Sequence, residues 1–296
     1  MSKYSKASES VSVVLPAKNE AASIGAVLDR IHAQMPGVEI VVVDDGSTDD
    51  TASVARNAGA RVISHPYSMG NGAAIKTGAR QALGDVLVFM DADGQHDPSD
   101  IPRLLGRLDE GYDMVVGARQ RGSQASVGRG VANHFYNRLA SYMTGQCVED
   151  LTSGFRAVRA EKFREFLYLL PNGFSYPTTC TMAFFRAGHA VAYEPIHAAR
   201  RIGQSHLRIV KDGIRFLLII FKVGTLYSPL KLFAPLSMAF FGLGLMWYAV
   251  TLVTQGRFTN MSALMLTTSV IVFMIGLVSE QITALMYRDS GRTRDE

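Results

Sequence analysis

The stretch that decides the fold reads Val86-Leu87-Val88-Phe89-Met90-Asp91-Ala92-Asp93-Gly94-Gln95-His96. Its five leading apolar residues predict a buried strand, because a strand covered on both faces has no reason to alternate apolar and polar side chains. The polar Asp-x-Asp-x-Gln segment then ends the strand, since Gly94 loosens the backbone and Pro98 bars extended pairing. In open α/β sheets, ligands bind at this carboxyl edge.

Two interpretations of this turn are open. Asp91, Asp93 and Gln95 offer two carboxylates and an amide oxygen at alternate positions, and Mg²⁺ held by such groups and by substrate phosphates fits this ligand set. Alternatively, the turn merely ends a strand, and Asp97 or Ser99 caps the following helix. Asp-x-Asp alone does not decide between them.

The rest of the chain alternates strands and helices. Apolar runs predict strands at 11–15, 38–43, 60–64, 155–158 and 190–196. Helical spacing predicts helices at 23–34, 51–58, 73–82, 128–142 and 161–170. Strands and helices joined by short loops indicate a mostly parallel sheet covered on both faces, which is an α/β fold.

Two further polar stretches lie at predicted strand ends. The turn at 68–72 precedes a helix and permits phosphate binding there, but it lacks the dinucleotide and Walker patterns, which favours a structural turn. Asp44 and Asp45 are adjacent carboxylates that need hydrogen-bond donors, and a ribose or a base edge would supply them. An acidic first helical turn is the alternative explanation.

The strand-end motifs resemble those of family-2 glycosyltransferases of the GT-A fold, a Rossmann-like fold. They are Pro16-Ala-Lys-Asn-Glu20, Val43-Asp-Asp-Gly-Ser-Thr-Asp49 and Met90-Asp-Ala-Asp-Gly-Gln-His96. Later motifs resemble the polyprenyl-phosphate branch, which includes dolichyl-phosphate mannose synthase and bacterial undecaprenyl-phosphate glucosyltransferases. These are Gly117-Ala118-Arg119, Arg129, Asn133 and Asp150-Leu-Thr-Ser-Gly-Phe-Arg156. The resemblance covers nearly the whole chain.

The resemblance implies a role for each matching residue. Nucleotide-sugar binding falls to Pro16, Ala17, Asn19, Glu20, Asp44, Asp45, Gly72, Lys76, Asp91, Ala92, Arg200 and Ser205. The catalytic residues would be Asp91, Asp93, Asp150, Arg119 and Arg129. Mg²⁺ or Mn²⁺ would be bound by Asp91, Asp93 and Gln95. The acceptor phosphate would be bound by Arg119, Arg129, Ser153 and Arg156. His206 stands where the family's Arg-x-x-Gly-x-Ser-Lys loop has lysine, so Arg200 is the better phosphate ligand of that loop.

The chemistry of such a transfer needs little acid–base help. A divalent cation stabilises the charge of the departing diphosphate. A lipid phosphate acceptor is already ionised at pH 7, so it needs positioning and charge neutralisation rather than a general base. We therefore expect Asp150 to orient the sugar or an arginine as readily as to act as a base. A cap on the Thr152 turn is its structural alternative.

Two charge-free stretches, 232–255 and 258–279, are each long enough to cross a hydrocarbon core of about 30 Å. Only Arg257 lies between them, whereas the first stretch is preceded by Lys211, Arg215, Lys222 and Lys231 and the second is followed by Arg288, Arg292 and Arg294. The positive-inside rule therefore predicts a cytoplasmic catalytic domain and cytoplasmic termini, at the inner membrane if the source is bacterial. The basic, apolar segment 214–226 suits the bilayer surface.

The predicted organisation has four parts. A GT-A catalytic domain spans 1–208, and a juxtamembrane amphipathic segment spans 209–230. The range 231–287 contains two transmembrane helices, at about 232–254 and 259–280. A cytoplasmic tail spans 288–296. The 296 residues carry a formal net charge of +4. Cys147 and Cys180 form no motif, which predicts free thiols in a reducing compartment. Residues 1–10 show no signal peptide.

The predicted function is inverting, metal-dependent transfer of one sugar from a UDP- or GDP-linked donor to undecaprenyl or dolichyl phosphate. A polysaccharide synthase shares the domain, but such enzymes usually carry Gln-x-x-Arg-Trp, and the single tryptophan here is Trp247. A catalytically silent sugar-nucleotide-binding membrane module is a second alternative, which intact Asp91, Asp93 and Asp150 disfavour. Two helices are too few for a flippase. The expected partners are the donor, the lipid, the bilayer and other copies of the chain, as in a tetramer, and no nucleic acid.

Overall fold

The computed structural model describes residues 9–119, 127–173, 175–197, 224–225 and 227–288, without the side chains of 127–133 and 287–288. The chain divides into two compact units, Met1–Leu207 and Arg208–Glu296. Several predictions lie outside the described residues. They concern Arg200, Ser205, His206, the side chain of Arg129, most of the segment 209–230, and the tail from 289 onward.

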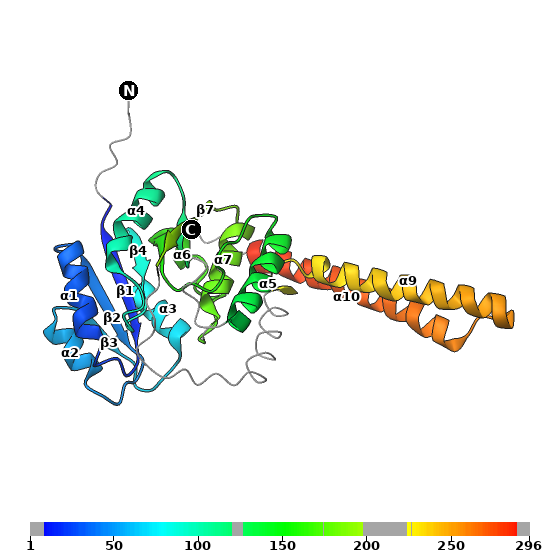
Figure 1. Ribbon diagram of the computed structural model, residues 1–296, viewed down its shortest axis with the longest axis horizontal. Coiled ribbons are helices and arrows are strands. Elements are labelled where there is room, and N and C mark those ends of the chain that lie inside the picture. Colours follow the sequence, from blue (N-terminus) through cyan, green and yellow to red (C-terminus); the bar gives the residue numbers. More distant parts are fainter. Residues whose placement is uncertain (1–8, 120–126, 174, 198–223, 226, 289–296) are drawn as a thin grey trace, which may run out of the picture. The chain divides into compact units, whose positions relative to one another are not determined.

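The first unit is built on a seven-stranded sheet with the order β3-β2-β1-β4-β6-β5-β7 (Figure 1). The strands are β1 (Val11–Ala17), β2 (Glu39–Asp44), β3 (Arg61–Ser64), β4 (Val86–Phe89), β5 (Met114–Arg119), β6 (Arg156–Arg159) and β7 (Val191–Ile196). All neighbouring strands run parallel except at β6, which is antiparallel to both β4 and β5. The predicted mostly parallel α/β sheet is confirmed.

Strand β1 runs two residues past its predicted end, through Pro16. Its pairing with β4 stops at Val14, whereas its pairing with β2 continues to Ala17. The Val14 carbonyl accepts from Met90 on the β4 side, so the nitrogen of Pro16, two residues on, faces the same side after the ladder has ended. A proline is tolerated where the sheet needs no donor.

Helices lie over both faces of this sheet (Figure 1). They are α1 (Ile24–Gln34), α2 (Thr51–Asn57), α3 (Asn71–Gln81), α4 (Ile101–Asp109), α5 (Val127–Thr144), α6 (Ala160–Arg164) and α7 (Tyr176–Arg186), with a 3₁₀ turn η1 (Pro98–Asp100) before α4. The sequence did not predict α7. Its residues 176–184 are all buried, so it has no polar face and no amphipathic period to detect. The helix predicted at 161–170 is regular only to Arg164, because the following turns close through i+3 hydrogen bonds.

Alternate strand residues pack on opposite sides of the sheet. Val13 and Leu15 join one apolar cluster with Leu28 of α1. Val14 faces the other side, where α3 approaches so closely that a Cβ at Gly78 would lie 2.3 Å from Val14 Cγ1. Each fully buried aliphatic side chain contributes about 1.5–3 kcal/mol, so this two-sided burial holds the sheet between its helical layers.

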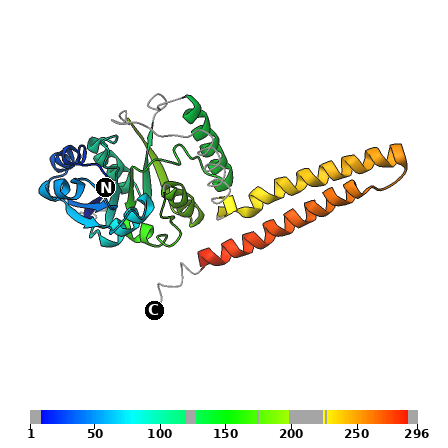
Figure 2. The same cartoon turned by 90° about the horizontal axis from the view of Figure 1, so that it is seen from below.

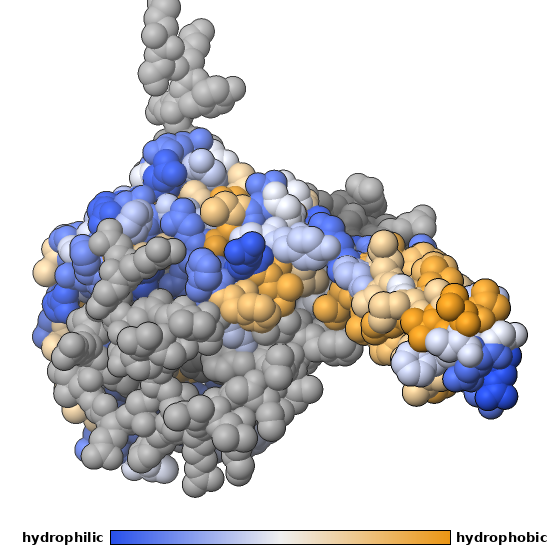
Figure 3. All heavy atoms as spheres, turned by 45° about the vertical axis from the view of Figure 1, so that its right-hand side comes forward, coloured by the Kyte–Doolittle hydropathy of each residue, from blue (hydrophilic) through white to orange (hydrophobic). Residues whose placement is uncertain are grey.

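The second unit is a pair of long helices, α9 (Pro229–Gln255) and α10 (Asn260–Arg288), which run side by side in Figures 1 and 2. Both are long and apolar enough to cross a membrane. Their exteriors expose large apolar side chains, Met238 and Val253 among them, and apolar surface covers much of the hairpin face seen in Figure 3. That exterior, in contrast to a buried core helix, matches a lipid-facing surface.

The facing sides of the two helices carry small residues every seven positions. The buried members are Ser237, Gly244 and Thr251 on α9 and Ser262, Ser269, Gly276 and Thr283 on α10. A seven-residue repeat keeps the same side of each helix toward its partner, and small side chains let the two backbones approach closely. The hydroxyl of Ser237 crosses the interface and donates to the Ser269 carbonyl at 3.0 Å.

One end of this hairpin is closed by a charged residue. The backbone N–H of Leu230, at the start of α9, donates to Oε2 of Glu280 at 3.2 Å. Ser228, which precedes α9, makes no side-chain cap bond. Glu280 therefore serves as a cap supplied by the neighbouring helix, and its carboxylate also suits the positive end of the helix dipole.

We predict that Gly276→Ala destabilises the hairpin whereas Gly242→Ala does not. A Cβ at Gly276 would lie 2.8 Å from Phe233 Cβ, while one at Gly242 would meet nothing within 4 Å. Both changes gain the same helix propensity, so their difference isolates overpacking, which costs about 1–3 kcal/mol. Thermal unfolding of the full chain in detergent should show a lower Tm for Gly276→Ala. Equal Tm values would contradict the packing described above.

Candidate active site

The predicted site residues gather at one edge of the sheet because of strand direction. The parallel strands β1, β2, β4 and β5 all end at this edge, and the antiparallel β6 begins there. The loop Asp150–Phe155, which leads into β6, is thereby brought to the ends of strands that precede it by 30 residues or more. Sequence motifs that lie far apart along the chain become neighbours.

The turn after β4 is held from beneath by a buried histidine. His96 stacks on Phe155 with ring centroids 5.1 Å apart, and its Nδ1 accepts the Asp91 N–H at 3.4 Å. Asp93 Oδ1 accepts the Gln95 N–H at 3.1 Å. The side chain of Asp91 remains 39% exposed, so the turn is fixed from below while this carboxylate meets solvent. Asp97 accepts from Ser99 N–H and caps η1, as the structural interpretation of the turn predicted.

The donor atoms of this turn fit a divalent cation that it shares with a ligand. Asp91, Asp93 and Gln95 are partly exposed and offer the hard oxygen atoms that Mg²⁺ and Mn²⁺ prefer. Within the described ranges, no group of three His, Cys, Asp or Glu residues could hold a metal by itself. A cation at this turn would take further oxygen ligands, and a diphosphate carries such ligands.

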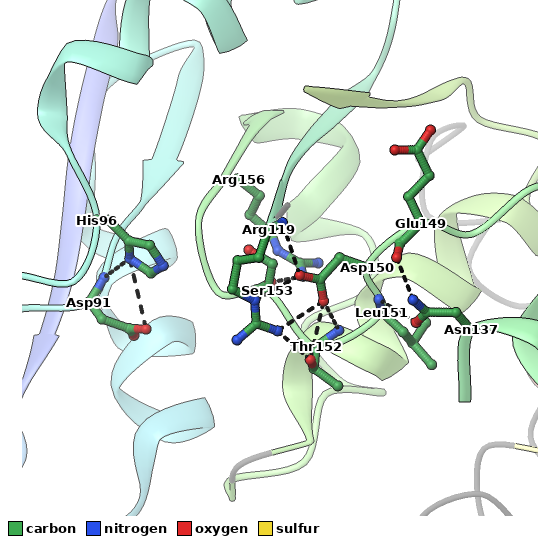
Figure 4. Close-up of polar contacts among 10 residues, drawn as sticks. All are labelled: Asp91, His96, Arg119, Asn137, Glu149, Asp150, Leu151, Thr152, Ser153 and Arg156. Atoms are coloured by element: carbon green, nitrogen blue, oxygen red, sulfur yellow. Dashed lines mark hydrogen bonds and ion pairs between the residues drawn. The ribbon is translucent and has the colours of Figure 1, made fainter. Parts of the chain in front are cut away.

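A bidentate ion pair joins the end of β5 to the loop before β6 (Figure 4). Arg119 Nε lies 2.8 Å from Asp150 Oδ2, and Nη2 lies 2.9 Å from Asp150 Oδ1 and 2.6 Å from the Thr152 hydroxyl. Burial alone would raise the pKa of Asp150, but the hydrogen bonds and charge of Arg119 outweigh it and hold that pKa below its ordinary value. Asp150 is thus an ionised carboxylate committed to Arg119.

The same guanidinium also faces Asp91. In the view of Figure 4 it lies between Asp150 and Asp91. Burial would lower the pKa of Arg119, but the hydrogen bond and charge of Asp150, and to a lesser degree the charge of Asp91, raise it. Its Nη1 makes no hydrogen bond to the described part of the chain, and the side chain is 28% exposed. Backbone also comes close here, since a Cβ at Gly154 would lie 3.3 Å from Asp91 Oδ2. Arg119 can therefore offer Nη1 to an anion beside Asp91.

The loops after β1, β2 and β4 are tied together by side chains. Asn19, in the left-handed region at φ 55°, accepts the Thr48 N–H through its Oδ1 at 2.8 Å. The Glu20 N–H donates to the Thr51 hydroxyl at 2.8 Å. Ser23 Oγ donates to the Ala92 carbonyl at 3.0 Å. These bonds make the predicted nucleotide-binding segments one connected surface, and Pro16 and Ala17 lie in the adjoining end of β1.

The two adjacent carboxylates after β2 have different surroundings. Asp45 accepts four hydrogen bonds within 2.8–2.9 Å, from His65, Ser68, Met69 and Gly70. Asp44 accepts one, from Ser47 N–H at 3.0 Å, among the bonds of the described residues. A carboxylate has about four lone-pair sites. Asp45 is therefore saturated and organises the loop, whereas Asp44 retains capacity for a ligand.

Gly72 and Lys76, which were predicted to bind the nucleotide sugar, contact the loop that precedes α7. A Cβ at Gly72 would lie 2.0 Å from the Pro171 carbonyl oxygen, so only glycine allows this approach. Lys76 Nζ donates to the Leu170 carbonyl at 3.1 Å and to Asn172 Oδ1. The turn 68–72 therefore docks the loop that precedes α7, as its structural interpretation predicted.

Two assignments to the acceptor phosphate are not supported. Arg156 is 0% exposed and Ser153 is 1% exposed, so neither side chain can meet a ligand from solvent. The Arg156 guanidinium instead donates to the Pro177 carbonyl at 3.1 Å, the Thr181 hydroxyl at 3.3 Å and the Ser153 carbonyl. Its role is to join β6 to α7 beneath the site.

Sequence reasoning missed several residues that shape the site. The side chain of His65, which is 7% exposed, lies between Asp45 Oδ1, 2.8 Å from Nδ1, and the Thr77 hydroxyl, 2.9 Å from Nε2. Tyr176 is buried in α7, and its hydroxyl donates to the Gly154 carbonyl at 3.4 Å. Asn137 of α5 holds the backbone on both sides of Asp150. None of the three belongs to a local sequence motif.

Comparison with known families matches both units. The model described as "Glycosyl transferase family 2" matches residues 12–167, more than half of the chain. The model described as "GtrB C-terminal hairpin" matches residues 228–285. The second match covers both long helices of the second unit, and the first covers the strands and loops that carry most of the site.

Curated relatives include undecaprenyl-phosphate 4-deoxy-4-formamido-L-arabinose transferases. The protein from Klebsiella pneumoniae is 34% identical over 205 residues, 66% of this chain and 62% of the relative. That from Proteus mirabilis is 32% identical over 221 residues, 71% of this chain and 66% of the relative. The chain thus spans slightly less than two thirds of the length of these relatives.

Solved structures similar to the chain include glucosyl-3-phosphoglycerate synthase from Mycobacterium tuberculosis. Its complex with Mn²⁺, UDP and glucosyl-3-phosphoglycerate aligns with a TM-score of 0.60 at 29% identity, covering 73% of this chain and 79% of that chain. Its complex with Mg²⁺ and UDP aligns with a TM-score of 0.59 at 30% identity and the same coverage.

We predict that the stability of the first unit falls in acid, partly through Asp45. Burial would raise its pKa, but hydrogen bonds from His65 and the 68–70 loop keep that pKa below its ordinary value. Its stabilisation is therefore complete above about pH 4 and is lost as pH falls through the folded pKa. Asp45→Asn should cost about 1.5–3 kcal/mol at pH 7.

Urea unfolding between pH 3 and 7 tests this prediction. Asp45→Asn should show a shallower pH dependence than the native chain, whereas Asp50→Asn, a change at an exposed neighbour, should behave like the native chain. A parallel pH dependence for Asp45→Asn and the native chain would refute the assignment.

Proposed function

The chain belongs to glycosyl transferase family 2, and we propose that it transfers one sugar from a nucleotide-sugar donor to a polyprenyl phosphate, with inversion at the anomeric carbon. The observation that carries this proposal is the position of Arg119, which is fixed by Asp150 and offers Nη1 beside Asp91. That arrangement provides an anion site next to a turn suited to a metal-bound diphosphate.

The donor half of the proposal rests on the connected loops. Asn19, Glu20 and Asp44 lie at the ends of β1 and β2, where the Asp44 carboxylate retains acceptor capacity for a ribose or base donor. Asp91, Asp93 and Gln95 would hold Mg²⁺ or Mn²⁺, which when bound would stabilise the charge of the departing diphosphate. The solved relatives named with UDP and either metal support this assignment. The donor sugar in this proposal is linked to UDP or GDP.

The acceptor half rests on charge and positioning. A phosphate monoester carries most of its second charge at pH 7, so its oxygen is already a nucleophile. Arg119 Nη1 would neutralise and orient it, and Arg129, predicted from the sequence, would assist. Asp150 would not remove a proton, because its carboxylate already accepts from Arg119 and Thr152. Attack on the face of the sugar opposite the diphosphate would invert the anomeric carbon.

The hairpin supports a lipid acceptor. Two apolar helices would hold the catalytic domain at the bilayer, which raises the effective concentration of a membrane-bound substrate. The proposed orientation, with the domain and both termini in the cytoplasm, follows from the positive-inside rule and the basic residues outside the two spans, Lys231 and Arg288 among them. The curated relatives are named for undecaprenyl phosphate. The homo-oligomer expected from the sequence stays a prediction.

We predict lipid-dependent release of nucleotide from one donor. Purified full chain in detergent would be incubated with Mg²⁺ or Mn²⁺, undecaprenyl phosphate and a panel of UDP- and GDP-sugars. Release should require the lipid, stop with chelator, and fall at least about 100-fold in Asp93→Ala, while the exposed-site control Asp50→Ala stays active. Release that ignores the lipid would indicate a different acceptor or polymer synthesis. Donor binding without release would indicate a silent module.

We further predict that Asp150→Asn lowers kcat without moving the acid limb of the pH–rate profile. Arg119 would lose its bidentate partner and its fixed direction, which costs about 10- to 100-fold. The acid limb should remain near the second pKa of the lipid phosphate, about 6, because Asp150 is ionised well below that pH. Loss of the acid limb in Asp150→Asn would instead identify Asp150 as a general base.

A further inference from the structure

We propose that Asn137 is a positioning residue for the transfer reaction, which it serves by fixing the backbone on both sides of Asp150. This inference rests on the proposed function. Asn137 Nδ2 donates to the Glu149 carbonyl, and the Leu151 N–H donates to Asn137 Oδ1 at 3.1 Å (Figure 4). One side chain thus holds the residue before Asp150 and the residue after it.

The side-chain amide of Asn137 can make this pair of bonds because it carries donors at one end and an acceptor at the other. The Glu149 carbonyl needs a donor, and the Leu151 N–H needs an acceptor, so the two ends of the Asn137 amide have a single consistent orientation. Aspartate at this position would lack the donor and would set a negative oxygen against the Glu149 carbonyl. Alanine would leave both backbone groups without their partner.

Helix α5 provides a firm support for this contact. Ser141, one turn after Asn137, accepts the Val148 N–H at 3.0 Å and donates to the Asn137 carbonyl at 2.7 Å. Residues four apart lie on the same side of a helix, so both side chains reach the same loop. Asn137 holds the loop at Asp150, whereas Ser141 holds it two residues earlier.

The consequence for chemistry passes through Arg119. With both flanking peptides fixed, the Asp150 side chain leaves the backbone in one direction, toward Arg119 Nε and Nη2. That bidentate contact in turn sets the direction of Nη1. A displacement of about 1 Å at a reacting group can cost about 100-fold in rate. Asn137 touches neither Arg119 nor any proposed substrate site through the bonds described here, so it acts only through Asp150.

The test compares kinetics of the full chain in detergent for Asn137→Ala, Asn137→Asp and the matched control Ser141→Ala. We expect kcat to fall about 10- to 100-fold in both Asn137 variants with the donor KM unchanged, and less than about 3-fold in Ser141→Ala. In the background of Asp150→Asn, Asn137→Ala should cause almost no further loss, because a residue that acts through Asp150 has nothing left to position. Multiplicative losses in the double variant would overturn the proposal.

Hydrogen exchange gives a readout that needs no activity. The Leu151 amide should exchange faster in Asn137→Ala than in the native chain, while the amides of α5 keep their protection. Unchanged protection at Leu151, or unfolding of both Asn137 variants in a thermal melt, would overturn the proposal. If the native chain transfers no sugar, the proposed function fails, and the Leu151 result still shows separately whether Asn137 holds this loop.

Discussion

The direction of one strand governs how the site is assembled. Because β6 runs antiparallel between β4 and β5, the loop before it reaches the edge where those two strands end. A parallel β6 would place Asp150 at the opposite edge, far from Arg119 and Asp91. The bidentate pair between Arg119 and Asp150 then fastens the β5 end to this loop. Reaction geometry in this chain therefore follows from sheet topology before any ligand binds.

The loop before β6 is also held by a charged side chain in the protein interior. Arg156 is fully buried and makes no ion pair with the residues that the structure describes. Burying an unpaired cation costs several kcal/mol unless polar groups surround it. Here Nη1 donates to the Pro177 carbonyl and the Thr181 hydroxyl, Nη2 donates to the Ser153 carbonyl, and the ring of Tyr176 lies 5.8 Å from Cζ. Arg156 thereby links the loop, β6 and α7 while Arg119, in the exposed layer above, remains available for an anion.

At the end of β2 and in the hairpin, too, polar groups that support the fold can be told apart from groups that can still bind a ligand. Asp45 and Asp44 are adjacent in the chain, yet Asp45 accepts four internal bonds and Asp44 accepts one among the described residues. Glu280 caps α9 across the hairpin and is thus explained by structure. An acidic residue at the right place in a motif can be a ligand or a support. The number of internal donors around it decides which.

The sequence by itself determined six of the seven strands, all but β5, together with the Asp-x-Asp turn, the family and the two apolar spans. These depend on local composition and period, and a stretch such as Val86–Met90 or 232–255 carries its signal within one window. Helix α7 was not predicted, because a helix buried on all sides shows no amphipathic period in its sequence. Tertiary structure alone decided that Ser153 and Arg156 are buried, that Gly72 and Lys76 contact the loop before α7, and that Asn137 holds the backbone around Asp150. Those roles depend on partners that lie between 3 and 101 residues away, and on whether the fold fills a side chain's hydrogen-bonding capacity, which no local pattern records.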